Sequence, residues 1–152
     1  MEIKTPSPLA MEHQALLAEL NMARRLGGHT GEAADRIERM MQTHIAKEEE
    51  FALPPLGLLQ ELASGHLEAG MMAAAYLAET LEKELPNLLA EHRMITAALE
   101  ELMAAASREG HQQVAFFAEK MMLHSRAEEL VTYPAAILVG RYLKMCDKNK
   151  SA

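Results

Sequence analysis

The sequence has no tryptophan, a single cysteine and no long run of apolar residues. Cys146 has no second cysteine in the chain with which to form a disulfide. The apolar runs are too short and too interrupted to cross a bilayer, and the first residues lack the charged and then apolar layout of a secretory signal. These absences predict a cytoplasmic, reducing location and no membrane partner.

Positive charge is also scarce. The chain carries 15 Lys+Arg against 22 Asp+Glu, which gives a formal net charge of −7. Nucleic acids and anionic membranes are bound by basic surfaces, so this balance excludes a nucleic-acid partner and slightly favours binding of cations. A length of 152 residues is that of one ordinary domain with a single core. We therefore expect one domain over residues 1–152.

An internal repeat is the most distinctive feature that is present. The stretches 44–54 and 124–134 share the order His, three residues, Glu-Glu, four residues, Pro, at a constant offset of 80 residues. Two Glu-His pairs, at 12–13 and 91–92, stand upstream of the copies at an offset of 79. Chance similarity rarely keeps such a register. We interpret the pattern as a duplication, with halves at about 8–54 and 86–134.

Apolar residues at helical spacing predict four main helices. The expected ranges are about 7–27, 30–51, 86–110 and 111–132, with further helical character over 71–85 and short helices near 56–63 and 137–145. Pro8 and Pro86 are expected in first turns, Pro134 is expected to end the fourth helix, and residues 147–152 are expected to fray. Because short loops join the first helix to the second and the third to the fourth, the predicted fold is all-α, an up-and-down antiparallel four-helix bundle.

Histidines and glutamates recur within the apolar stripes of these helices. His44 with Glu48, and His124 with Glu128, are four residues apart and so project from one face of a helix. A carboxylate inside a buried stripe must be paired or bound, because an isolated buried charge is too costly. Imidazole and carboxylate donors together suit Fe, Mn or Zn. The predicted metal ligands are His13, His44, Glu48, His92, His124 and Glu128.

Distances along the chain predict that these donors share one layer. His13 and His44 lie about 15 residues before and after the first loop, so at about 1.5 Å per residue they reach the same height. His92 and His124 are likewise nearly equidistant from Gly110. Four histidines and two glutamates should therefore converge in the core.

The order of the six donors resembles the hemerythrin-like (HHE cation-binding) domain, and the resemblance covers essentially the whole chain. It implies a four-helix bundle around two non-haem iron ions with an oxide or hydroxide bridge, and Mn or Zn as possible substitutes. By position, it places His13 and His44 on one metal and His92 and His124 on the other, with both glutamates bridging. The implied function is to bind, sense or react with oxygen, peroxide or nitric oxide, or to hold iron, and enzymatic turnover is left open.

One position departs from the oxygen-carrying hemerythrins. Those proteins have a fifth histidine one turn beyond the one matched by His92, where this chain has Thr96. The donor set then leaves an open position on both metals, unless another side chain such as Tyr133 or Glu49 enters. Reversible oxygen carriage, which relies on an asymmetric pair, is therefore disfavoured.

Alternative functions for an acidic helical chain are a metal-free structural bundle and a histidine phosphotransfer module. The first leaves two carboxylates buried without cause, and the second needs one exposed histidine. Ferritin-like di-iron oxidases use Glu-x-x-His motifs, which differ from the order found here. The glutamates next to the predicted ligands are rotated by about 100° and are assigned to a solvated face or a supporting role. They are Glu12, Glu49, Glu91 and Glu129.

Overall fold

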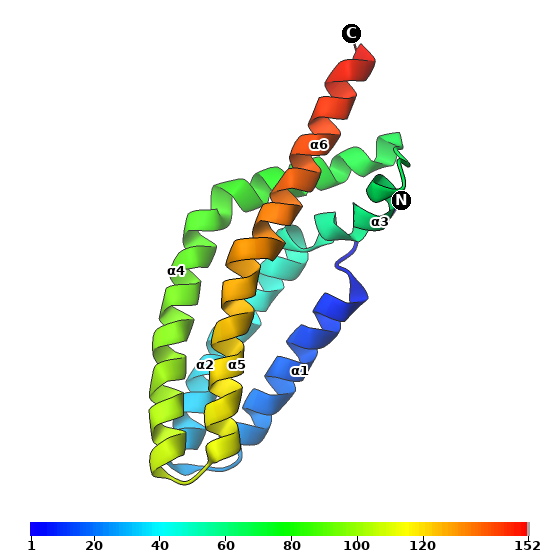
Figure 1. Cartoon of the computed structure of the whole chain (residues 1–152). Helices are drawn as coiled ribbons and strands as arrows, with labels where there is room; N and C mark the ends of the chain where they lie inside the picture. The colour runs from blue at the N-terminus through cyan, green and yellow to red at the C-terminus, as the bar shows by residue number, and fades with distance from the viewer. Residues whose placement is uncertain (152) are drawn as a thin grey trace.

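The computed structural model describes residues 1–151, and every regular element in this range is helical (Figure 1). The prediction of an all-α fold is therefore confirmed. None of the described helices is long and apolar enough to cross a membrane. The α-helices are α1 (Ser7–Arg24), α2 (Gly28–Lys47), α3 (Leu59–Ala63), α4 (Met72–Arg108), α5 (Gln112–Ala127) and α6 (Tyr133–Ser151). The π-helical segments are η1 (Glu48–Ala52) and η4 (Glu128–Thr132), and the 3-10 segments are η2 (Pro54–Leu58) and η3 (Ala69–Met71).

The long helices pack side by side as a bundle. α1 lies against α2, α2 against α4, and α4 against α5. The turns between α1 and α2 and between α4 and α5 lie at the same end of the molecule, at the bottom of Figure 1. Gly27 and Gly110 occupy these turns with positive φ angles of 69° and 80°, which glycine adopts without steric cost. Above the turns, the helices enclose a core that includes Leu20, Ile37 and Leu99, each 0% exposed.

Glu109 connects the two turns. Its carboxylate accepts hydrogen bonds from the Thr30 backbone N–H at 2.7 Å and the Thr30 hydroxyl at 2.6 Å, and so satisfies unpaired donors at the N-terminus of α2. The hydrogen bonds from Thr30 hold the pKa of Glu109 at about 2. The end of α4 therefore caps the start of α2.

The prediction that a helix begins at Pro86 is wrong. Pro86 lies in the interior of α4, which starts at Met72 and runs unbroken to Arg108. A proline inside a helix removes one backbone hydrogen bond and bends the helix rather than ending it when packing holds both sides. Leu81 and Leu88, on either side of the proline, are 0% exposed, and α4 bends along its course in Figure 1.

Pro134 does not end a helix either. η4 continues into α6, and α5, η4 and α6 follow one another as a single long rod (Figure 1). The Tyr133 N–H bonds to the Glu128 carbonyl five residues back, a π-type bond that shifts the hydrogen-bond register just before the proline. Pro134 has no backbone N–H to donate, and it stands where the register changes rather than within a run of regular α-helical hydrogen bonds. The short helix expected over 137–145 and the frayed end expected from residue 147 are instead one helix that reaches Ser151, and residue 152 lies outside the described residues.

Candidate metal centre

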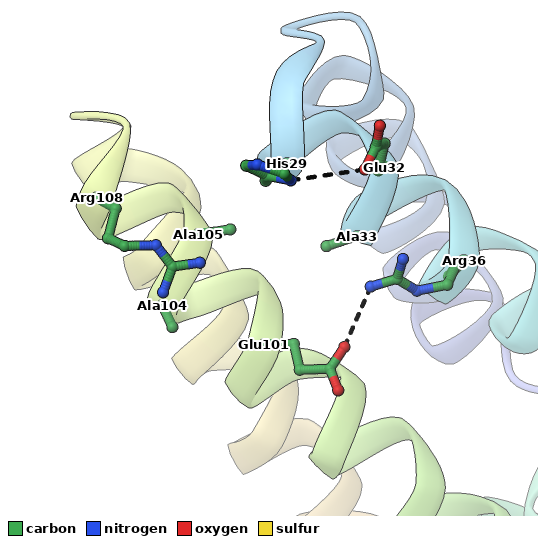
Figure 2. Close-up of a pocket in the computed structure, with 8 residues that line it drawn as sticks. All are labelled: His29, Glu32, Ala33, Arg36, Glu101, Ala104, Ala105 and Arg108. Carbon is green, nitrogen blue, oxygen red and sulfur yellow. Dashed lines mark hydrogen bonds and ion pairs between the residues drawn. The ribbon is translucent and has the colours of Figure 1, made fainter.

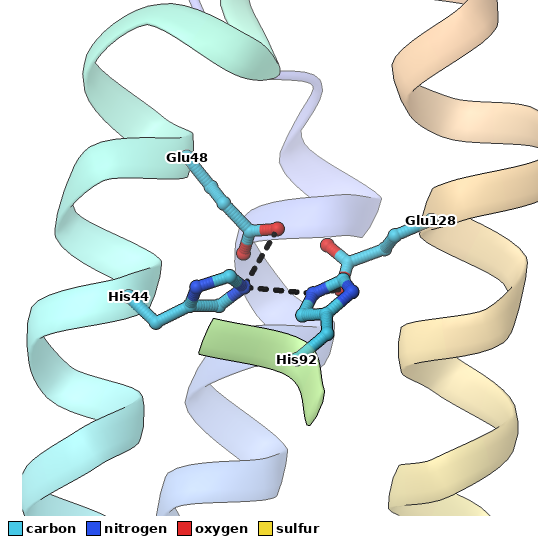
Figure 3. Close-up of side chains that lie close together, drawn as sticks. All are labelled: His44, Glu48, His92 and Glu128. Atoms are coloured by element: carbon cyan, nitrogen blue, oxygen red, sulfur yellow. Dashed lines mark hydrogen bonds and ion pairs between the residues drawn. The ribbon is translucent and has the colours of Figure 1, made fainter. Parts of the chain in front are cut away.

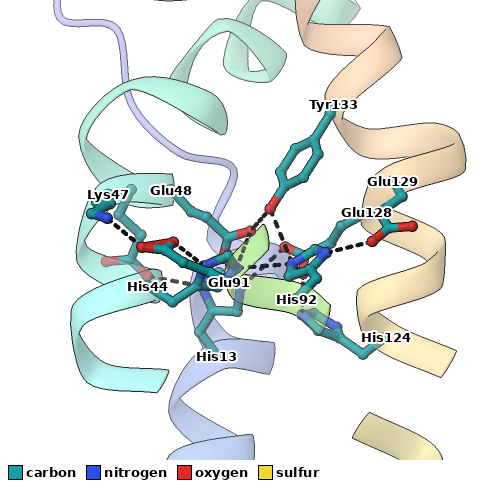
Figure 4. Close-up of polar contacts among 11 residues, drawn as sticks. His13, His44, Lys47, Glu48, Glu91, His92, His124, Glu128, Glu129 and Tyr133 are labelled. Carbon is teal, nitrogen blue, oxygen red and sulfur yellow. Dashed lines mark hydrogen bonds and ion pairs between the residues drawn. The ribbon is translucent and has the colours of Figure 1, made fainter. Parts of the chain in front are cut away.

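The six predicted ligands lie together in one buried layer of the bundle (Figures 3 and 4). Five of them are between 0% and 4% exposed, and the His124 side chain is 10% exposed. α1, α2, α4 and α5 each contribute one histidine, and the two π segments contribute the glutamates. The expected convergence of these residues at one height is therefore present in the structure.

The first group of donors surrounds what we call the His44–His92 position. The Nε2 atoms of His44 and His92 lie 2.9 Å apart. Glu48 Oε1 lies 3.3 Å from His44 Nε2, and Glu128 Oε1 lies 3.5 Å from His92 Nε2. One donor atom from each of these four residues falls within 4.8 Å of all the others, so a single ion can contact all four.

The second group surrounds the His13–His124 position, where Glu128 lies between two histidines. Glu128 Oε1 is 3.2 Å from His124 Nε2, and Glu128 Oε2 is 3.7 Å from His13 Nε2. Glu48 Oε2 lies 3.3 Å from His13 Nε2, so Glu48 also reaches both positions. Glu48 therefore presents one oxygen to each group, whereas Glu128 reaches both groups with Oε1 and His13 with Oε2, so both carboxylates lie between the two positions as bridging ligands do.

This pairing of histidines differs from the one implied by the hemerythrin resemblance, which joins His13 to His44 and His92 to His124. Spacing along the chain fixes the height of each histidine but does not fix the rotation of its helix. Each helix also has a second neighbour in the bundle, since α2 contacts α4 as well as α1. The rotation turns His44 towards His92, across the contact between α2 and α4.

Four further glutamates lie behind the histidines, one on the Nδ1 side of each ring. The Nδ1 atom of His44 lies 2.9 Å from Glu91, that of His92 lies 3.0 Å from Glu129, and that of His124 lies 3.0 Å from Glu12. His13 Nδ1 lies 3.3 Å from Glu49. These four glutamates therefore support the histidines from behind, which is one of the two roles expected for them.

Each of these glutamates belongs to a different helix from the histidine it contacts. The pairs join α1 to η1, α2 to α4, α4 to η4 and α5 to α1, so they form a closed ring around the bundle. A carboxylate that accepts from Nδ1–H fixes the tautomer in which the Nε2 lone pair points inward, and it raises the basicity of the ring. All four imidazoles are thereby oriented towards the inner layer.

The two inner glutamates titrate differently. Burial, together with the nearby Glu128 carboxylate, raises the pKa of Glu48 above its ordinary value. Burial also opposes ionisation of Glu128, but the neighbouring imidazoles of His124, His13 and His92 outweigh it and hold the pKa of Glu128 well below its usual range. Two carboxylates this close repel each other unless cations separate them.

The histidines compensate this charge in the metal-free protein. Burial alone lowers the pKa of an imidazole, but Glu48 and Glu91 raise that of His44 to about 9. Against the same effect of burial, Glu128 and Glu12 raise the pKa of His124 to about 9. The buried carboxylates therefore attract positive charge, which either protons or metal ions can supply.

The donor spacing fits metal ions. Ligand bonds of about 2.0–2.2 Å at near-octahedral or tetrahedral angles place donor atoms about 3.0–3.5 Å apart, close to the separations within both groups. Two buried atoms, Glu48 Oε2 and His124 Nε2, also make no hydrogen bond with any residue in 1–151. Buried polar atoms rarely lack a partner, so these two are available to an ion.

Spacing along the chain does not place Tyr133, which the structure adds to the centre. Its phenol is 1% exposed, donates a hydrogen bond to Glu48 Oε1, and lies 3.2 Å from His92 Nε2 (Figure 4). The Tyr133 ring stacks on that of His92 at 19°. Tyr133 follows η4, and a π turn carries the residue five positions after Glu128 round to the same side of the chain. Ordinary helical phase does not predict this.

A larger cavity elsewhere is a poorer candidate for a site. It has a volume of about 420 Å³ between α2 and α4, near the turns, and is lined by residues that include His29, Arg36 and Arg108 (Figure 2). Two pairs of its polar groups already contact each other, Arg36 with Glu101 at 3.1 Å and His29 with Glu32 at 3.7 Å. No buried polar atom without a partner lies among its lining residues.

In comparisons with known proteins, no family model, no curated protein and no solved structure matches this chain.

Proposed function

We propose that this protein is a non-haem di-iron protein of the hemerythrin-like type, in which α1, α2, α4 and α5 form an up-and-down four-helix bundle around the two ions. Its function would be to bind, sense or react with a small oxidant or diatomic ligand, or to hold iron. The observation that carries the proposal is the buried layer in which two glutamates each lie within contact distance of histidines from both pairs.

The residues of the chain have distinct roles in this proposal. His44 and His92 would hold one ion and His13 and His124 the other, with Glu48 and Glu128 bridging them. When bound, iron supplies redox-active Lewis-acid centres for small oxygen or nitrogen ligands. The ring of outer glutamates keeps each Nε2 atom directed inward before an ion arrives.

A histidine phosphotransfer role finds little support in this layer. His13, His44 and His92 are each 1% or 2% exposed, so another protein could not reach them without unfolding the bundle. A metal-free structural role would leave Glu48, which is 0% exposed, next to a second buried carboxylate with only protonated histidines to offset their charge.

The test is a titration of metal-free protein with iron(II) under anaerobic conditions. We expect two ions per chain. His92→Ala should reduce the count, whereas His66→Ala, a change at a side chain that is 54% exposed, should leave it at two. A wild-type protein that binds one ion or none would contradict the proposal. Mn(II) and Zn(II) titrations would then establish which metal the site prefers.

A further inference from the structure

The sequence repeat relates the two metal positions to each other. The offset of 79 or 80 residues takes His13 to His92, His44 to His124 and Glu48 to Glu128. It therefore exchanges the His13–His124 position with the His44–His92 position. Any side chain that contacts one position has a counterpart at the other, and a difference between the two counterparts makes the positions inequivalent.

Tyr133 and Leu53 are such a pair of counterparts. They lie 80 residues apart, each immediately after a π segment. Both backbone N–H groups bond to the carbonyl of the glutamate five residues back, Glu48 for Leu53 and Glu128 for Tyr133. Both side chains are 1% exposed. The backbone hydrogen bond is thus the same at the two sites, but one residue carries a phenol and the other an aliphatic group.

The phenol covers the His44–His92 position. Tyr133 extends from the start of α6 so that its hydroxyl lies over Glu48 and His92, and its ring stacks on the His92 ring (Figure 4). A ligand approaching the ion from this side would have to displace a fully buried aromatic ring.

The His13–His124 position is instead reached by a cavity. This cavity has a volume of about 270 Å³ and is lined by His13, His124 and Glu128 together with Leu9, Leu53 and Val131. Val131 is 64% exposed, so it stands at the mouth. His124 Nε2, one of the buried atoms without a hydrogen bond, belongs to a residue on this wall.

We propose that small uncharged ligands reach the metal pair only at the His13–His124 position, through this cavity, because Tyr133 closes the other position. The inference rests on the proposed di-iron function and makes it specific. An uncharged ligand is favoured because the walls combine apolar side chains with the carboxylate of Glu12, which repels anions and which no Lys or Arg in 1–151 neutralises. Nitric oxide, dioxygen and hydrogen peroxide all meet this description.

Nitric oxide titration of the iron(II) protein tests the proposal, with iron counted first in each sample. The wild-type protein should hold two irons and bind one nitric oxide per chain. Exchanging the counterparts should change this number, to two in Tyr133→Leu and to none in Leu53→Tyr, where a phenol enters the cavity. Tyr76→Leu alters a tyrosine that is 64% exposed and should behave as wild type.

A second pair of variants tests the route without altering the buried centre. Val131→Trp places a large ring at the mouth of the cavity and should slow nitric oxide binding at least tenfold. Leu130→Trp adds the same ring at a neighbouring residue that is 60% exposed and does not line the cavity, so its rate should not change. Two nitric oxides per two irons in the wild type, or equal rates in these two variants, would overturn the inference and leave the di-iron function standing. An iron count below two in the wild type would overturn that function itself.

Discussion

Two carboxylates lie behind the histidines of the His44–His92 position, and each of them pairs with a Lys or an Arg. Within the described residues, the two carboxylates behind His13 and His124 have no such partner. Glu91 accepts a hydrogen bond from Lys47, and Glu129 lies 3.7 Å from Arg126. Among residues 1–151, no Lys or Arg forms an ion pair with Glu12 or Glu49. The two metal positions therefore have the same kinds of donor but differ in the charge behind their histidines.

The repeat shows how this difference arises. The residues equivalent to Lys47 and Arg126 are Ala127 and Ala46, so each half supplies one cation and both cations fall behind the same metal position. A carboxylate that is not neutralised makes the imidazole in front of it a stronger donor. The His13–His124 position should therefore be the more electron-rich of the two, and it is also the one that the cavity reaches.

The largest expected effect comes from a glutamate that serves both positions. Glu128 lies within 3.7 Å of His13, His92 and His124, so Glu128→Gln should abolish binding of at least one iron and weaken the other severely. Its neighbour Glu129 contacts one histidine from behind, and Glu129→Gln should keep two irons. Iron counts after dialysis measure both, and equal losses would contradict the assignment of inner and outer glutamates.

The pairing of histidines can be tested by double substitution. His13→Ala with His124→Ala should empty one position and leave the other with its two histidines, so one iron should remain. His13→Ala with His44→Ala removes one histidine from each position and should weaken both. If the first of these variants binds no iron and the second binds one tightly, the pairing implied by the hemerythrin resemblance is correct instead.

Much of the centre follows from the sequence, because height and phase along a helix are local properties. The spacing of His44 and Glu48, and their repetition at 124 and 128, was enough to gather these residues in one layer. The choice of partner was not accessible, since it depends on how α2 rotates against α4. A sequence pattern has no information on that contact beyond the shared apolar face.

The predictions at the prolines are wrong for a related reason. Local rules place proline at helix boundaries, so they predict a helix start at Pro86 and a helix end at Pro134. Buried residues on both sides of Pro86 hold α4 together across it, and the π segment before Pro134 removes the conflict there. The same π segment carries Tyr133 into the centre. The sequence feature that points to Tyr133 is the repeat, which aligns it with Leu53 and so marks a difference between the two copies.

A smaller effect is expected from the outer glutamates, and it should differ between positions. Glu12→Gln removes a carboxylate that no Lys or Arg in 1–151 neutralises, so it should reduce iron affinity at the His13–His124 position by about 10- to 100-fold. Glu91→Gln removes a carboxylate whose charge Lys47 already compensates, so the loss of iron affinity should be smaller. Affinities from competition with a chelator decide this, and a greater loss for Glu91→Gln would reverse the proposed asymmetry.

The smallest expected effect is a pH dependence of the metal-free protein. His44 belongs to one position and His124 to the other, and carboxylates raise the pKa of each from 6.5 to about 9 despite burial. A raised imidazole pKa contributes stability that is complete below pH 6.5 and is lost as the pH rises through about 9. Glu48, whose pKa is also raised, acts in the same direction, whereas the contribution of Glu128 is already complete above its ordinary pKa of 4.5.

The Tm of the metal-free protein should therefore fall by a few degrees or more between pH 6.5 and pH 9, since about 1 kcal/mol corresponds to about 2–4 °C in a chain of this length. His44→Gln and His124→Gln should each remove a similar part of this slope, because each removes one of the titrating groups. The iron-loaded protein should not show the fall, because metal binding requires neutral imidazoles and strengthens as protons leave. Thermal unfolding followed by circular dichroism measures all four samples. A slope that survives both substitutions would place the titration outside the centre, and a slope lost in only one variant would show that the two positions differ in the metal-free protein as well.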